Sequence, residues 1–296
     1  MVSIQKKVVS GQTYYYLEHS FRKGGKVEKK ELYLGKHIPK NIDELKRQFV
    51  FEIYKEKWFK SFDEIKTAFA KERKSLPKVV AEKEMSSFVV KFTYDTNRIE
   101  GSSLTFRETA NLLENGVSPS KPRSDIKEAE AHRDVFYEML RYDKDLSLRI
   151  ALEWHYKLFN GTKPEIAGKL RHYQVGISGT EFLPPSPVEV EPLMRDFFKW
   201  LDKNKKKLHP VELAALIHLK FVSIHPFGDG NGRISRLIMN FALKQNRFPM
   251  LDIKYTNRNS YYNALERAQV KKNDLTFLNW FFRTYSKEFK RYAKRV

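Results

Sequence analysis

The stretch His225-Pro226-Phe227-Gly228-Asp229-Gly230-Asn231-Gly232-Arg233-Ile234-Ser235-Arg236 largely decides the fold of this chain. Apolar residues at helical spacing lie before it, over residues 213–224, and after it, over residues 234–243. Between them stand three glycines, which allow positive φ angles and a close approach of the backbone to a ligand. The sequence therefore predicts a helix that ends, a glycine-rich turn, and a second helix that begins.

The side chains of this stretch suit the binding of a nucleotide phosphate, with a side chain beside it that can act as a general base. The N-terminus of the second helix offers unpaired N–H groups and a partial positive charge. Arg233 and Arg236 can each pair with phosphate oxygens through two hydrogen bonds. Asp229 can hold a Mg²⁺ ion that bridges those oxygens. His225 is of a residue type that titrates near about pH 6.5, so it can take a proton from a hydroxyl nucleophile.

Other kinds of site are excluded by the spacing of the residues. The glycines do not follow G-x-G-x-x-G, and no Lys-Ser or Lys-Thr pair follows them as a P-loop requires. The carboxylates do not match an EF-hand loop. His218 and His225 could share a helix face, but no third ligand stands at zinc spacing.

The stretch resembles the signature of the Fic family, H-P-F-x-[D/E]-G-N-G-R-x-x-R, and every specified position is filled. Enzymes of this family usually transfer AMP from ATP to a Ser, Thr or Tyr hydroxyl of a target protein. The resemblance covers about residues 85–285. It implies a mainly α fold, a Fic-type all-α helical bundle with the signature on a loop between two central helices. Gly232 favours nucleotidyl transfer, because the Doc branch, which phosphorylates its targets, has a lysine there.

The resemblance also implies the roles of individual residues. His225 is the expected catalytic base and Asp229 the expected Mg²⁺ ligand. The residues expected to bind the substrate ATP are Gly230, Asn231, Gly232, Arg233, Arg236, Tyr261 and Tyr262. Among them, Asn231 is expected to orient the α-phosphate and the two arginines to bind the β- and γ-phosphates. The two tyrosines are expected at the adenine, although their spacing is also typical of half-buried core residues.

An inhibitory segment is expected on the N-terminal side of this core. Thr96-Asn97-Arg98-Ile99-Glu100-Gly101 is similar to the motif [S/T]-x-x-x-E-[G/N] of autoinhibited Fic proteins, at the end of a helix expected over about residues 79–101. A glutamate near a helix C-terminus is electrostatically unfavourable. The resemblance implies that Glu100 pairs with Arg236 and so holds ATP in an unreactive position. Some related enzymes use this glutamate to remove AMP, so de-AMPylation stays open.

A second segment resembles the family's target-binding flap. It contains Val175, Gly176, Ile177, Ser178 and Gly179 and ends at Pro184-Pro185. The alternation of apolar residues before the Gly179 turn predicts a short β-hairpin. In Fic enzymes the flap covers the site and pairs with the backbone of the target, as strand addition at an exposed edge allows.

The remainder of the chain predicts two domains. Residues 1–40 read as a small N-terminal antiparallel β-sheet of three strands, and residues 41–296 as a helical domain with the Fic core at about 105–285. The segment 61–64, Ser-Phe-Asp-Glu, resembles a capping box and predicts a helix start. The aromatic residues of the sheet either stack on nucleic-acid bases or, more commonly, bury against a helix.

Composition sets the remaining expectations. The chain has 56 Lys and Arg against 36 Asp and Glu, a net charge of +20, which attracts polyanions. The alternative hypothesis is therefore a basic nucleic-acid-binding regulator with a vestigial Fic site. No cysteine is present, and no apolar run is long enough for a membrane helix, so we expect no membrane contact and a cytoplasmic location. The sequence does not identify the target protein and leaves self-modification and a homodimer open.

Overall fold

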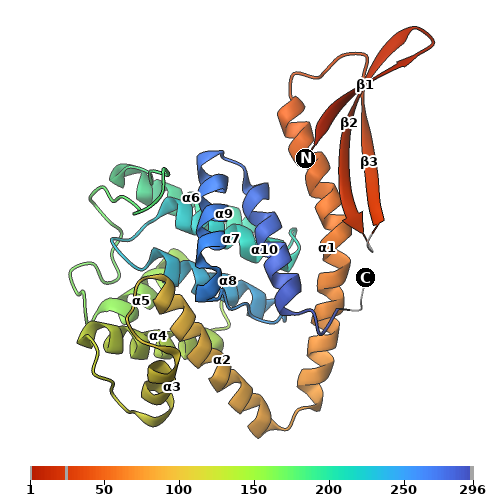
Figure 1. Cartoon of the computed structure of the whole chain (residues 1–296). Helices are drawn as coiled ribbons and strands as arrows, with labels where there is room; N and C mark the ends of the chain where they lie inside the picture. The colour runs from red at the N-terminus through yellow and green to blue at the C-terminus, as the bar shows by residue number, and fades with distance from the viewer. Residues whose placement is uncertain (1, 24–25, 294–296) are drawn as a thin grey trace. The chain divides into compact units, whose positions relative to one another are not determined.

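The computed structural model describes residues 2–23 and 26–293, and Figure 1 traces the chain. Its strands are β1 (Ser3–Val9), β2 (Gln12–Lys23) and β3 (Lys26–Gly35). Its helices are α1 (Ile42–Ser75), α2 (Lys78–Ile99), α3 (Phe106–Asn115), α4 (Arg123–Arg141), α5 (Leu148–Phe159), α6 (Pro187–Asn204), α7 (Pro210–Ile224), α8 (Asn231–Gln245), the short 3₁₀ helix η1 (Tyr255–Asn257), α9 (Arg258–Val270) and α10 (Asp274–Glu288). The mainly α fold with an N-terminal sheet is confirmed.

The chain packs into two compact units, and the division falls within α1 and within α10. The first unit is Met1–Ala68 together with Phe282–Val296, and the second is Phe69–Phe281. The predicted boundary at residue 40 is thus different from the observed one. A small sheet has a face that must be covered, and here the first unit combines the sheet with most of α1 and the end of α10.

The first unit contains an antiparallel sheet in the order β1-β2-β3, with a bulge at Tyr15/Tyr16. Leu17, in the central strand, is fully buried. Helix packing in this unit centres on Phe62, whose ring centroid lies 5.3 Å from that of Phe282. Tyr33 is 55% exposed and its ring packs against Tyr16 of the neighbouring strand. The sheet aromatics are therefore only partly buried.

Helix α1 is continuous through residues 61–64, so the predicted helix start there is wrong. No glycine or proline interrupts residues 42–75, and Phe62 and Ile65 are both buried on the same helix. A cap-like sequence does not end a helix when the backbone can continue and the apolar face is covered. Thr105 and Glu108, by contrast, form a capping box that opens α3.

The second unit is an all-α bundle around α7 and α8. Both helices are buried along most of their length, as their apolar composition predicts. Helices α2, α4 and α5 pack against α8, and α6 packs against α7. The loop 225–230 joins the two central helices. Within the described residues, no helix has both the length and the apolar character that a membrane span requires.

Candidate active site

The loop between α7 and α8 has a defined backbone. His225 follows the end of α7 in the left-handed conformation, with φ 53° and ψ 58°, and Gly230 has φ 80° immediately before α8. Between them the side chain of Asn231 accepts a hydrogen bond from the Phe227 N–H at 2.8 Å and donates one to the Phe227 carbonyl at 2.9 Å. Both polar groups of Asn231 thus hold the loop, and the predicted contact with the α-phosphate would have to use the second N–H of the same amide.

A buried histidine, His155, packs against this loop and bonds its main chain. The ring of His155 stacks on Phe227, with centroids 3.7 Å apart. Its Nδ1 accepts a hydrogen bond from the Gly168 N–H at 2.9 Å, so Nε2 carries the proton and donates to the Asp229 carbonyl at 3.0 Å. Burial lowers the pKa of His155 to about 4, so this tautomer persists at neutral pH. The sequence analysis did not identify His155 as a site residue.

His225 is arranged as a general base. Its Nδ1 lies 3.2 Å from the Val222 carbonyl, which can only accept, so Nδ1 carries the proton and Nε2 is left with a free lone pair. Burial, and to a lesser extent the charge of Arg171, lower the pKa of His225, against the opposing effect of the Val222 carbonyl. The imidazole is therefore neutral at pH 7, as a base must be.

The predicted metal ligand, Asp229, belongs to a closed ring of alternating charges. Lys163 Nζ lies 2.6 Å from Asp229 Oδ2 and 3.1 Å from Glu128 Oε1. Arg233 pairs with Glu128 and, at 3.2 Å, with Asp229 Oδ1. Burial alone would raise the pKa of Asp229, but Arg233 and Lys163 bring it below its usual value. Asp229 is thus a carboxylate at neutral pH.

Mg²⁺ suits this carboxylate if a nucleotide accompanies it. Mg²⁺ commonly uses one or two carboxylates and completes its octahedron with phosphate oxygens and water. Among the described residues, no group of three or more His, Cys, Asp or Glu side chains is placed to hold a metal. A single ionised Asp229 could therefore hold Mg²⁺ bound with ATP, and Lys163 is the cation with which the ion would share this carboxylate.

Arg236 and Glu100 form the predicted pair. Arg236 is 1% exposed, and its Nη2 lies 2.5 Å from Glu100 Oε1. Thr96, the first residue of the inhibitory motif, accepts from Arg236 Nε through its hydroxyl at 2.6 Å and from Nη2 through its carbonyl at 3.2 Å. Burial opposes the charge of Arg236, but Glu100 outweighs it and raises the pKa. The end of α2 therefore holds this arginine by both side chain and main chain.

The carboxylate of Glu100 also lies at the N-terminal turn of α8. A Cβ atom added at Gly232 would come within 2.1 Å of Glu100 Oε1 and 3.0 Å of Arg236 Nη1. Glu100 caps α2, where a negative charge is disfavoured, but its carboxylate is close to a helix N-terminus, where a negative charge is favoured. The position of the carboxylate at the α8 N-terminus, which suits an anion, therefore offsets the unfavourable place of Glu100 at the C-terminus of α2.

The two tyrosines of α9 differ in their surroundings. Tyr261 is 1% exposed, and its hydroxyl lies 3.3 Å from Arg236 Nη1 and 2.9 Å from His218 Nε2. It packs in the core and supports Arg236, so its position does not suit the predicted stacking on adenine. Tyr262 is 43% exposed and its hydroxyl donates to the Ile99 carbonyl at 3.0 Å. Of the two, Tyr262 is therefore the accessible tyrosine, and it also contacts α2.

The predicted flap is a loop rather than a hairpin. Residues 172–186 contain a turn at Ser178 and Gly179 but no strand pairing. The loop is attached to α9 by the Glu181 N–H, which donates to Glu266 Oε1 at 2.8 Å. Two prolines end the segment at 184 and 185 and cannot donate ladder hydrogen bonds. A hairpin therefore has no second strand here, and residues 175–177 have no regular secondary structure before the turn at 178–179.

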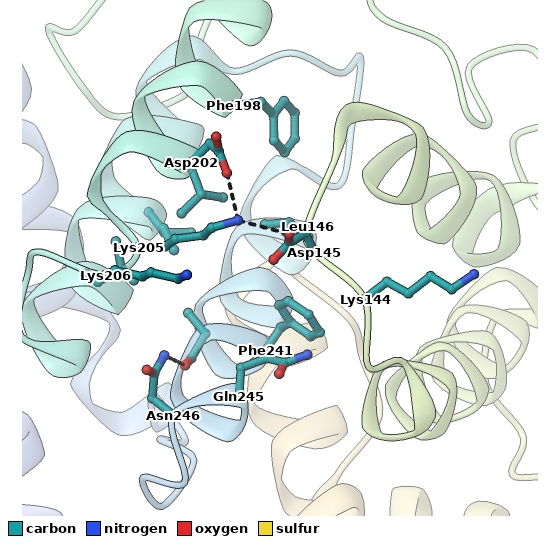
Figure 2. A pocket seen from close by; sticks show the side chains of 14 residues that line it. Lys144, Asp145, Leu146, Phe198, Asp202, Lys205, Lys206, Phe241, Gln245 and Asn246 are labelled. Atoms are coloured by element: carbon teal, nitrogen blue, oxygen red, sulfur yellow. Dashed lines mark hydrogen bonds and ion pairs between the residues drawn. The ribbon is translucent and has the colours of Figure 1, made fainter.

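A cavity elsewhere in the bundle has no link to these residues (Figure 2). It has a volume of about 460 Å³ and lies among α6, α7, the C-terminal end of α8 and residues 144–146. Lys205 in its wall lies 2.9 Å from Asp145 and 2.7 Å from Asp202. The signature residues are at the opposite, N-terminal end of α8, and none of the expected site residues lines this cavity.

Comparisons with known proteins agree with the geometry. Residues 145–243 match the Fic/DOC family model. The protein carries a Fic/DOC domain. A curated relative, Protein adenylyltransferase Fic of Nematostella vectensis, is 35% identical over 181 residues, which cover 59% of this chain and 42% of the relative. The chain thus spans less than half the length of this relative.

Solved structures show the same fold over a larger part of the chain. A Fic domain containing signaling protein from Bacteroides thetaiotaomicron has a TM-score of 0.70 and 26% identity, and the match covers 78% of this chain and 97% of that chain. Fic-1 from C. elegans has a TM-score of 0.71 and 26% identity, over 86% of this chain and 77% of that chain. Both matches extend well beyond residues 145–243.

Elements outside the matched Fic/DOC region complete the site. His225, Asp229 and both arginines of the signature lie within it, but α2, α4 and α9 do not. The C-terminal end of α2 contributes Thr96 and Glu100, α4 contributes Glu128, and α9 contributes Tyr262. Sequence reasoning missed Glu128, Lys163 and His155, because each is a single charged or polar residue outside a motif, and only the fold brings it to the signature.

Proposed function

We propose that the protein is a protein adenylyltransferase that transfers AMP from ATP to a Ser, Thr or Tyr hydroxyl of a target protein and is autoinhibited by Glu100. The observation that carries the proposal is the pairing of Glu100 with Arg236 at the N-terminus of α8, beside a neutral His225. The curated relatives that match this chain are named protein adenylyltransferases, and Gly232 of the signature favours nucleotidyl transfer.

The chemistry follows from the side chains. Nε2 of His225 takes the proton of the target hydroxyl, whose oxygen forms a bond to the α-phosphorus of ATP. The bond from that phosphorus to the bridging oxygen breaks, and pyrophosphate leaves. The N-terminal N–H groups of α8, from Gly230 to Gly232, stabilise the charge on the phosphate oxygens. Arg233 and Arg236 bind the terminal phosphates, and Tyr262 lies beside the adenine ring of ATP.

Asp229 would hold Mg²⁺, which neutralises the charge on the phosphates when bound. Arg233 already contacts Asp229 at 3.2 Å, so the two residues would present a cation and a metal ligand to the same phosphates. Lys163, whose Nζ lies 2.6 Å from Asp229 Oδ2, would add a second positive charge beside these phosphates. This arrangement selects a polyanionic substrate such as the triphosphate of ATP.

Autoinhibition follows from competition for Arg236. With Glu100 in place, the guanidinium is already paired, and a terminal phosphate approaching it meets a carboxylate instead. ATP then binds in a position unsuited to in-line attack, and small displacements reduce the rate steeply. The same carboxylate near the site could activate water to remove AMP, so de-AMPylation belongs to this proposal as a second activity.

The target protein binds along the flap in this proposal. Residues 175–179 are in a loop with exposed and half-exposed side chains, which leaves main-chain groups for a target backbone. The protein's own hydroxyls are candidate acceptors as well. We place the protein in the cytoplasm and leave open whether it forms a homodimer.

A nucleic-acid-binding regulator is the second candidate function. The first unit, residues 1–68 and 282–296, has 21 Lys and Arg and 10 Asp and Glu, so it carries +11 of the net charge of +20 in a minority of the residues. Such a charge favours nucleic acid. This candidate requires binding of DNA or RNA that weakens with salt, in a protein that transfers no nucleotide.

The test uses ATP labelled at the α- or the γ-phosphate, with Mg²⁺, on the whole protein. Wild type, Glu100→Gly, Glu100→Gly/His225→Ala and the surface control Glu114→Gly are compared for label retained on protein. We expect label only from α-labelled ATP, strong in Glu100→Gly, weak in wild type and in Glu114→Gly, and absent in the double variant. Label from γ-labelled ATP would mean phosphorylation and would contradict the proposal.

A further inference from the structure

A buried arginine outside the signature, Arg171, connects the main chain of His225 to the flap. Arg171 is 4% exposed, and among the described residues its side chain donates only to main-chain carbonyls. A buried guanidinium is costly unless its donors are satisfied. Because it has five N–H groups in a rigid plane, it can join several carbonyls that no other side chain could reach together.

Two of these carbonyls belong to the end of α7. Arg171 Nε lies 2.7 Å from the His225 carbonyl, and Nη2 lies 3.5 Å from the Ile224 carbonyl. In addition, the Arg171 N–H donates to the Pro226 carbonyl at 2.9 Å. The last carbonyls of a helix have no partner within the helix, and the left-handed backbone of His225 is disfavoured for a side chain with a Cβ. Arg171 therefore stabilises the left-handed backbone conformation of His225, which is otherwise disfavoured.

The other two carbonyls flank the flap. Arg171 Nη1 donates to the Tyr173 carbonyl at 3.1 Å, and Nη2 donates to the Pro185 carbonyl at 2.6 Å. Residues 174–184 lie between these two points. One guanidinium thus contacts both ends of the flap and the main chain of His225.

The charge of Arg171 acts on His225 as well. Burial is the larger cause of the lowered pKa of His225, and the Arg171 cation adds to it. A positive charge beside the imidazole disfavours protonation. The neutral base required at pH 7 is therefore supported by the same residue that fixes its main chain.

We propose that Arg171 is a positioning residue that sets the flap relative to His225, so that a hydroxyl presented by the flap lies within reach of Nε2. Arg171 does not touch the nucleotide in this scheme; it acts through His225 and the flap. The inference rests on the proposed adenylyltransferase function for its kinetic part, and on the geometry alone for its structural part.

The kinetic test is made in the Glu100→Gly background, with transfer of labelled AMP from α-labelled ATP onto the protein itself as the readout. The variants are Arg171→Met, Arg171→Lys and Arg171→Ala, with Arg149→Met as a control for an exposed arginine. We expect Arg171→Met to lower the maximal rate by about 100-fold, the effect of a displacement of about 1 Å. The ATP concentration that gives half the maximal rate should change by less than about 3-fold, because the phosphate ligands are intact.

Two further results separate positioning from mere stabilisation. Lysine, a point charge without the planar fork, should not restore the rate. Guanidinium chloride at millimolar concentration should partly restore the rate of Arg171→Ala, because it can enter the space lined by the four carbonyls. If Arg171→Met lowers only the melting temperature and the folded protein keeps its full transfer rate, the proposal is wrong.

A readout without catalysis distinguishes failure of this inference from failure of the proposed function. NMR titration of the His225 ring should show a higher pKa in Arg171→Met than in Arg149→Met, because the nearby cation is removed. Thermolysin should cut within residues 174–184 faster in this variant than in Arg149→Met. If Glu100→Gly alone transfers no label, the adenylyltransferase proposal fails, and these two measurements still decide the role of Arg171. An unchanged titration with unchanged proteolysis would overturn it.

Discussion

Glu100 Oε1 lies 2.5 Å from Arg236 Nη2, and the two residues come from helices 136 positions apart in the sequence. The arginine is almost fully buried, whereas a quarter of the glutamate side chain is exposed. A ligand can therefore displace Glu100 into solvent but cannot displace Arg236. This asymmetry makes the carboxylate the movable partner in a site whose cation is fixed.

Removing the hydroxyl of Thr96 should destabilise the protein, because Thr96 fixes that cation. Thr96→Val leaves the buried Nε of Arg236 without its acceptor at 2.6 Å, which should lower the free energy of unfolding by about 1–3 kcal/mol. Urea unfolding followed by circular dichroism measures the change. The matched control is Thr67→Val, whose exposed hydroxyl bonds the Asp63 carbonyl and whose loss should cost no more than about 0.5 kcal/mol. Equal effects in the two variants would show that Thr96 has no special role.

A methyl group at residue 232 should clash with Glu100 and not with the helix itself. Gly232→Ala places a Cβ within 2.1 Å of Glu100 Oε1, and such overpacking costs about 1–3 kcal/mol. In the Glu100→Gly background the closest clash is removed and only the contact with Arg236 Nη1 at 3.0 Å remains, while alanine is the better helix former by about 1 kcal/mol. A double-mutant cycle of unfolding free energies should therefore give a coupling of at least about 1 kcal/mol. Additive effects would place the Glu100 carboxylate elsewhere.

Lowering the pH should destabilise the helical bundle already below about pH 6.5, at pH values where carboxylates are still ionised. Burial lowers the pKa values of His132, His155 and His218 to about 3, 4 and 3. Their neutral forms are favoured in the fold, so the unfolded chain binds more protons below its own pKa of about 6.5. Stability is then constant above about pH 6.5 and falls as the pH decreases, by up to about 2 kcal/mol per histidine at pH 5.

Urea unfolding at pH 8 and at pH 5 measures this loss. His132→Gln should reduce the difference between the two pH values, because one of the three buried groups no longer titrates. The same unfolding free energy at both pH values, within about 1 kcal/mol, would mean that the unfolded chain gains no extra protons at these three sites.

The sequence predicted the parts of the site that lie within one continuous stretch. The signature predicted the turn between two helices, the base and the phosphate-binding helix N-terminus, because glycine, arginine and histidine act there over twelve residues. The motif around Glu100 predicted its pairing with Arg236 only through resemblance to a family, since nothing in composition or periodicity brings two such distant helices together.

The differences between prediction and structure have separate physical causes. Asn231 has the residue type of a phosphate ligand, and in the structure its amide also bonds the Phe227 main chain. Tyr261 has the residue type of a stacking surface, but it is buried beneath Arg236. The flap sequence alternates like a strand, yet it has no second strand to pair with. In each case a side chain or segment of the right type has partners that only the three-dimensional packing determines.

The central claim is that Glu100 takes the place of the terminal phosphate at Arg236, and nucleotide affinities test it most directly. We would measure the dissociation constants of ATP and ADP, with Mg²⁺, by calorimetry in His225→Ala and in His225→Ala/Glu100→Gly, where no transfer consumes the nucleotide. His225→Ala/Glu114→Gly is the control. We predict that loss of Glu100 raises the preference for ATP over ADP by at least about 10-fold, since a charge-assisted hydrogen bond contributes about 1.5–3 kcal/mol. An unchanged preference would contradict the claim.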